Sequence, residues 1–101
     1  MASSSFNHDI SAIPPTSMSN EDISSYTAES GNWYITPSDG YAWINESGSS
    51  SAGTLQICDR NKNVFTYFVA PIGSVFGIYV KKGMGIRGTG FMGLRFIKFN
   101  Y

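Results

Sequence analysis

The sequence predicts an all-β domain, an antiparallel β-sandwich, and two observations carry that prediction. First, residues 33–44 place two short runs rich in aromatic and β-branched residues on either side of a Pro37-Ser38-Asp39-Gly40 turn. Runs of this kind are too short for helices and too apolar for loops. Second, similar runs recur between turn-forming residues about every ten residues, which is the spacing of a sandwich or barrel. No stretch has the apolar period of an amphipathic helix.

The chain divides into two predicted parts. Residues 1–30 form a polar N-terminal arm or lead-in, and residues 31–101 form the β domain. In the arm, Pro14-Pro15 disfavours a helix, and a single helical turn is allowed near residues 20–23. In the domain we expect strands at residues 33–36, 41–45, 54–58, 64–69, 74–80 and 94–99.

The connections between these strands have distinct compositions. We expect Gly40 to adopt a positive φ at the exit of its turn. The Ser- and Gly-rich residues 46–53 predict a flexible surface loop, and residues 60–63 a polar hairpin connection. Residues 83–93 match the G-x-G-x-x-G pattern twice, but a strand rather than a helix follows them. We therefore interpret this segment as tight turns or a bulged edge, not as a nucleotide-binding loop.

The charges balance, but they are unevenly distributed. Seven Lys and Arg residues match seven Asp and Glu residues, which argues against a nucleic-acid partner. All seven acidic residues precede residue 60, and all seven basic residues follow residue 59. Two interpretations stay open: early acidic strands lie beside late basic strands and cancel them, or the basic half forms an open binding patch. No apolar run is long enough for membrane insertion, and the polar N-terminus does not resemble a signal peptide.

The residues that usually carry chemistry do not form a catalytic pattern. The single histidine, His8, lies in the arm, so a Ser or Cys nucleophile has no evident base. Cys58 ends a run that we interpret as buried, and one Cys with one His cannot build a metal cluster. Asp39, Glu46 and Asp59 lie in turns or at strand ends, and Asp39 is interpreted as a hydrogen-bonding turn residue. We expect no enzyme activity, no catalytic or metal-binding residue and no cofactor.

Two aromatic residues and two loops are the candidates for ligand contact. Strand alternation puts Tyr41 and Trp43 on one face, where they either stack on sugar rings or line the core or a subunit seam. Binding residues concentrate on loops of a rigid scaffold, which favours residues 46–53 and 83–93. The candidate ligand-binding residues are Trp43, Arg87 and Met92.

Three motifs together resemble a known family. Pro37-Ser38-Asp39-Gly40-Tyr41 is followed by Ile78-Tyr-Val-Lys-Lys-Gly83 and then by Leu94-Arg-Phe-Ile97. This order is similar to that of the small trimeric jelly-roll domains, related in shape to tumour-necrosis-factor and C1q heads, that cap bacteriophage fibres and tail needles. The likeness covers roughly residues 10–101. It departs at Thr36, where the family usually has Ala, and at Met84, where it usually has Asp.

The resemblance implies a homotrimeric virion protein, a fibre-tip or knob domain for host-surface attachment or particle decoration. Such a protein is made in the host cytoplasm and contacts host-surface glycan or other virion subunits. Aromatic residues of the late strands are then expected near the three-fold axis, namely Phe76, Phe91, Phe96 or Phe99. The alternative function is a stand-alone, lectin-like carbohydrate-binding module, which would be monomeric.

Overall fold

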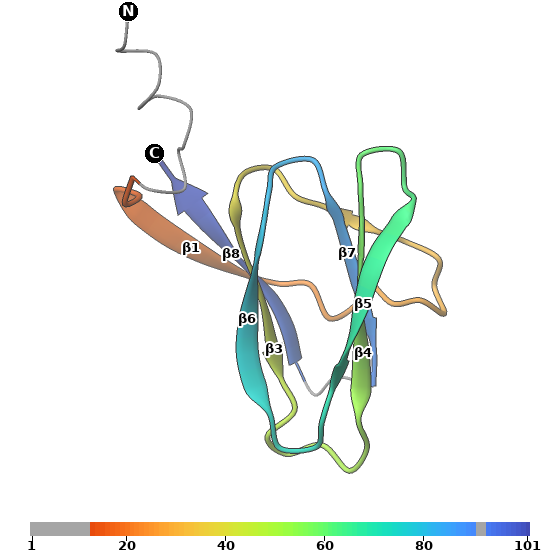
Figure 1. Ribbon diagram of the computed structural model, residues 1–101. Coiled ribbons are helices and arrows are strands. Elements are labelled where there is room, and N and C mark those ends of the chain that lie inside the picture. Colours follow the sequence, from red (N-terminus) through yellow and green to blue (C-terminus); the bar gives the residue numbers. More distant parts are fainter. Residues whose placement is uncertain (1–12, 91–92) are drawn as a thin grey trace, which may run out of the picture.

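The structure is a computed structural model that describes residues 13–90 and 93–101, with the backbone alone described at 65–67. Two four-stranded antiparallel sheets face each other (Figure 1). We call them sheet A, with strand order β1-β8-β3-β6, and sheet B, with strand order β2-β7-β4-β5. The strands are β1 (Ser17–Asp22), β2 (Tyr34–Ile35), β3 (Gly40–Asn45), β4 (Gly53–Cys58), β5 (Val64–Ala70), β6 (Val75–Val80), β7 (Gly85–Thr89) and β8 (Gly93–Asn100).

The strand order is that of a jelly roll. Successive strands change sheet at every connection except the β4–β5 hairpin, and the first described strand, β1, pairs with the last, β8. Eight-stranded sandwiches whose connections cross repeatedly between the two sheets in this order are jelly rolls. The predicted fold class, an all-β antiparallel sandwich of the jelly-roll type, is confirmed.

The core lies between the sheets and comes from the inward positions of the alternating strands. Phe96 on β8, Ile44 on β3 and Leu55 on β4 are wholly buried there. Cys58 is also wholly buried, as the sequence predicts, and burial raises the pKa of its thiol. The core cluster consists of Ile23, Tyr34, Ala42, Ile44, Leu55, Ile57, Ala70, Val80, Ile86, Leu94 and Phe96.

Strand β1 lies within the segment interpreted as an arm. It pairs with β8 from Ser17 opposite Asn100 to Asp22 opposite Arg95, and all six of its residues are exposed. The next residue, Ile23, is wholly buried, and its backbone N–H donates to Leu94 O at 2.9 Å. The single helical turn that the sequence allowed near residues 20–23 is not formed, because pairing with β8 holds this segment extended.

Strand β7 occupies the segment expected to form turns or a bulged edge. It lies inside sheet B, between β2 and β4, and its two flanking glycines, Gly83 and Gly90, have φ of 88° and 72°. Gly85 is tightly enclosed: a Cβ there would come within 2.5 Å of Cys58 Sγ and 3.2 Å of the Trp33 ring. The glycines thus form turns only at the ends of the segment, while Gly85 allows close packing within a strand.

Gly40 corrects another expectation. It is not among the glycines with positive φ, so the turn does not need it for a left-handed conformation. A Cβ at this position would instead collide with the Ile97 carbonyl oxygen and lie 2.8 Å from the Phe96 ring. Gly40 is required because β3 begins directly against β8.

Candidate binding surfaces

The outer face of sheet A carries an apolar, aromatic surface that we call face A, defined by Met18, Tyr41, Trp43 and Ile97. Ala42 and Ile44 of β3 point into the core, so Tyr41 and Trp43 point outward. The register places Tyr41 between Ile97 and Tyr79. The sequence left three roles open for Tyr41 and Trp43: stacking on sugar rings, lining the core and lining a subunit seam. The core is excluded, because the two residues are 41% and 37% exposed.

An aromatic cluster supports one end of face A. Phe99 packs edge-on against Tyr41, with ring centroids 5.2 Å apart, and Tyr79 lies 6.0 Å from Tyr41. The Tyr101 ring also packs edge-on against Phe99, with ring centroids 6.4 Å apart. These contacts leave Phe99 only 8% exposed and hold the Tyr41 ring in place on the strand.

Beside this cluster, face A is hollowed. A cavity of about 660 Å³ is lined by Met18, Asn20, Tyr41, Trp43, Gly77 and Ile97. Gly77 lies opposite Trp43 in the register, and a Cβ there would lie 3.4 Å from the indole ring. The sequence analysis missed Met18 and Asn20, because nothing in a polar segment marks it as an edge strand that completes this face.

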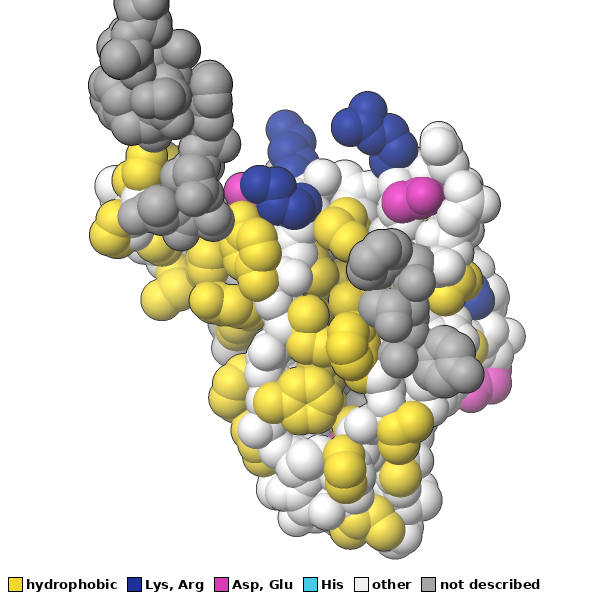
Figure 2. Space-filling view, viewed as in Figure 1, with side chains coloured by type: hydrophobic (Ala, Val, Ile, Leu, Met, Phe, Trp, Pro, Cys, Tyr) yellow, Lys and Arg dark blue, Asp and Glu magenta, His cyan; other side chains and the backbone are white. Residues whose placement is uncertain are grey.

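A second apolar surface follows the side of the sandwich at β5 and β6, the last strands of their two sheets. We use the name edge patch for the exposed apolar residues of β5, β6 and their connection, Phe68, Val69, Ile72 and Val75. The register points Val69 to the outer side of sheet B, Phe68 toward the gap between the sheets, and Val75 to the outer side of sheet A. These residues are between 36% and 63% exposed. Figure 2, in the same view as Figure 1, shows hydrophobic side chains over the side of the molecule where β5 and β6 lie in front.

The predicted site residues do not meet. Trp43 lies on face A, whereas Arg87 lies on the outer face of sheet B. The Arg87 guanidinium stacks 3.9 Å from the centroid of the Trp33 ring, and its Nε donates to Gln56 Oε1 at 2.8 Å. Met92 lies outside the described residues. Arg87 thus lies on strand β7, where Trp33 and Gln56 hold its side chain, and not on the irregular loop that the sequence suggested.

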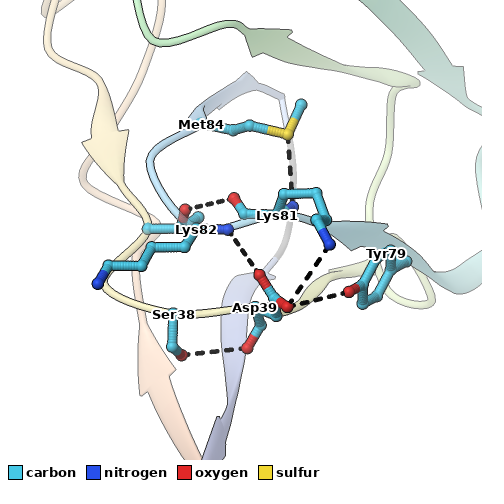
Figure 3. A network of polar contacts seen from close by, with 7 residues as sticks. Ser38, Asp39, Tyr79, Lys81, Lys82 and Met84 are labelled. Atoms are coloured by element: carbon cyan, nitrogen blue, oxygen red, sulfur yellow. Dashed lines mark hydrogen bonds and ion pairs between the residues drawn. The ribbon is translucent and has the colours of Figure 1, made fainter. Parts of the chain in front are cut away.

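Asp39 connects the β2–β3 connection to the β6–β7 turn (Figure 3). Its carboxylate accepts hydrogen bonds from the Lys82 backbone N–H at 2.9 Å and the Tyr79 hydroxyl at 3.2 Å. It also pairs with Lys81 Nζ at 3.8 Å, and the Asp39 carbonyl accepts from the Phe99 N–H at 3.0 Å. Asp39 therefore does more than shape its own turn.

The two departures from the family pattern lie in the same region. The Thr36 N–H donates to Met84 O at 2.9 Å, and the Thr36 hydroxyl donates to Lys81 O at 2.8 Å. The motifs around residues 37–41 and 78–83, read separately in the sequence, form one joint in space.

Beside this joint lies a cationic pocket of about 260 Å³. It is formed by the β4–β5 turn and the β6–β7 turn, and Figure 2 shows Lys and Arg side chains at this end of the molecule. The Asp59 carboxylate accepts the backbone N–H groups of Asn61 and Asn63 at 2.9 and 3.0 Å. The lining residues are Asp59, Arg60, Lys81, Lys82, Gly83 and Met84.

Within the described ranges, no group of three or more His, Cys, Asp or Glu side chains is placed to hold a metal ion. The described residues also contain no helix long and apolar enough to cross a membrane. Comparison of the chain with protein-family models, curated proteins and solved structures finds no match.

Proposed function

We propose that the chain is a non-enzymatic assembly and binding module, the knob or fibre-tip domain of a virion, which associates as a homotrimer. One observation carries this proposal: a single jelly roll exposes apolar side chains both on face A and along the edge strands β5 and β6. Monomeric proteins rarely leave extended apolar surface open, and such surface is typical of interaction sites. The order of motifs that resembles phage knob domains supplies the virion context.

Two different patches favour a head-to-tail contact. When the edge patch of one copy packs against face A of the next, each copy uses both surfaces once, and the contacts form a closed ring when the rotation from copy to copy is a whole fraction of a turn. The contact also covers the open edges of β5 and β6, which otherwise present unpaired backbone groups. The ring is expected to contain three copies because the family resembled is trimeric.

The charges at face A are compatible with contact between identical copies. Asp22 lies directly opposite Arg95 in the register, on the side of face A toward Trp43. Opposite charges so placed cancel locally, so two copies do not repel each other across this surface.

The residues expected near the three-fold axis need revision in this proposal. Phe96 is wholly buried within one chain and Phe99 is nearly so, which leaves neither free to contact another copy extensively. Phe76 is partly buried against the core, and Phe91 lies outside the described residues. We assign the contact to Tyr41 and Trp43 on face A and to the exposed residues of the edge patch.

Light scattering of purified variants tests the proposal. We expect the mass of three chains for the wild type and for the control Ser50→Asp, which adds the same charge to an exposed loop residue. Trp43→Asp on face A and Val69→Asp on the edge patch should each give monomers, because each buries a charge in the contact. A monomeric wild type at micromolar concentration would defeat the proposal.

Mixing the two monomeric variants tests the head-to-tail geometry. Val69→Asp retains an intact face A, and Trp43→Asp retains an intact edge patch, so one intact contact can form between them. The expected product is a dimer containing one copy of each variant. If Val69→Asp alone stays oligomeric, the contact uses face A on both copies, and the head-to-tail arrangement is wrong.

The hollow beside Trp43 favours one alternative function, a monomeric carbohydrate-binding module. An exposed indole opposite Gly77, with Asn20 in the lining, has the parts that stack on and hydrogen-bond to a neutral sugar ring. A monomeric wild type whose glycan binding is lost in Trp43→Ala, with unchanged melting temperature, would replace the trimer proposal with this one.

A further inference from the structure

We propose that the cationic pocket at the end of the sandwich binds one acidic group, a carboxylate or a phosphate, of a surface polysaccharide. The inference goes beyond assembly, because none of the residues that line this pocket belongs to face A or to the edge patch. It assigns a role to basic residues of the second half of the sequence, although the net charge of the whole chain is zero.

Two turns bring the cations together. Arg60 comes from the β4–β5 turn, while Lys81 and Lys82 come from the β6–β7 turn, so positive charge lines the pocket from two separate segments. The Asp39 joint holds the β6–β7 turn in place through the Lys82 N–H, and the Asp59 carboxylate holds the β4–β5 turn. Charged groups on fixed backbone lose less conformational freedom on binding than groups on mobile loops.

The neighbouring carboxylates are engaged elsewhere. Asp59 accepts two N–H groups of its own turn, and Asp39 faces Lys81, Tyr79 and the backbone of Lys82. Figure 3 shows the Lys82 ammonium group directed away from Asp39. Lys81, which also lines the pocket, is paired with Asp39, so Arg60 and Lys82 are the cations that we assign to the anion. An anion entering here meets ammonium and guanidinium donors, which form its strongest hydrogen bonds.

The size and lining of the pocket narrow the ligand class. Its volume of about 260 Å³ is below the range of roughly 300–1,000 Å³ typical of sites that enclose a whole small molecule. It therefore fits one charged group while the rest of the ligand lies outside. None of the described residues that line it is aromatic, so they give the bases of a nucleic acid no stacking platform. An acidic polysaccharide needs no such platform.

Isothermal titration at low salt tests this inference with four polymers. Polygalacturonate presents carboxylates, phosphomannan presents phosphates, dextran is the neutral control, and single-stranded poly-dT is the competing class. We expect one or both acidic polysaccharides to bind and dextran not to bind. The tighter of the two identifies the preferred group, and added salt should weaken the binding.

Matched single substitutions locate the site. Arg60→Gln and Lys82→Gln should each weaken binding about tenfold, the loss expected for one charge-assisted hydrogen bond. Lys98→Gln removes the same charge from β8, outside the pocket, and should leave the affinity unchanged. Binding by neither acidic polysaccharide, equal weakening in Lys98→Gln, or poly-dT binding as tightly as the polysaccharides would overturn the proposal. Measuring mass in the same buffer separates this result from failure of the trimer.

Discussion

Asp39 shows how one side chain can join two parts of the fold. Its carboxylate is mostly buried, with 13% of the side chain exposed, and it accepts hydrogen bonds from Tyr79 and from the Lys82 backbone. Lys81, its ion-pair partner, is 59% exposed. Hydrogen bonds to a buried carboxylate stabilise more than an ion pair with a solvated lysine.

Substitution of Asp39 should therefore destabilise the fold more than substitution of Lys81. We expect Asp39→Ala to lower the free energy of unfolding by about 1–3 kcal/mol, since it leaves the Lys82 N–H without its acceptor. Lys81→Ala should cost no more than about 1 kcal/mol, because its side chain is largely exposed. Urea denaturation measures both. Equal losses in the two variants would show that the ion pair, not the hydrogen bonds, dominates the joint.

At this scale the sequence predicted local roles better than partners. The turn role of Asp39 follows from its place before Gly40, but its contacts with residues 79–82 depend on where another turn lies in space. Alternation placed Tyr41 and Trp43 on one face, yet both faces of β3 carry apolar residues. Only the opposing sheet decides which face becomes the core.

The close packing of β7 against β4 can be tested at the scale of the element. Gly85→Ala should destabilise the protein by about 1–3 kcal/mol, because the new methyl group overlaps Cys58 Sγ. The double variant Gly85→Ala/Cys58→Ala should recover part of that loss, since the sulfur is gone. Thermal denaturation of the four proteins in this cycle measures the coupling. Purely additive losses would contradict the packing account.

Gly77→Ala is the matched control. A Cβ there would meet its nearest atom, in the Trp43 ring, at 3.4 Å, which is ordinary van der Waals contact. Its effect should be limited to the higher β propensity of alanine and its smaller conformational freedom in the unfolded chain, both relative to glycine, and should stay within about 1 kcal/mol.

Two strands, β1 and β7, were not predicted from the sequence, and the reasons differ. β1 is exposed throughout and polar except for Met18, so no alternation marks it, and its extended form depends on pairing with β8 near the other end of the sequence. β7 contains Gly85 and Gly88, and glycine is normally depleted in strands. The six predicted strands all exist, because their apolar alternation is local and reflects burial on one side.

Acidic residues lie early in the sequence and basic residues late, and across the whole molecule the fold brings some of each together. Asp22 lies opposite Arg95, and Asp39 pairs with Lys81, so early acids meet late bases at both places. Arg60, Lys81 and Lys82 meanwhile gather around one pocket. Pairing of early acids with late bases therefore occurs at two places, and an open basic patch stays a prediction for the pocket.

This layout predicts lower stability in acid. Hydrogen bonds from the backbone and hydroxyl of Ser24, and then the charge of Arg95, lower the pKa of Asp22 below its ordinary value of 3.8. A lowered folded pKa adds stability above the unfolded value, and that stability is lost as pH falls through the folded value. Asp22→Asn should therefore melt below the wild type at pH 6 and match it near pH 2. An equal difference at both pH values would exclude this origin.

The position of β8 has a further consequence, for the order in which the molecule can form. β8 follows every other described strand in the sequence, yet it lies inside sheet A and separates β1 from β3. During synthesis β3 and β6 can pair with each other, but β1 has no partner until β8 leaves the ribosome. Pairing across such a long loop is entropically slow. The nascent chain therefore carries an unclosed sheet and exposed apolar side chains until its last described strand arrives.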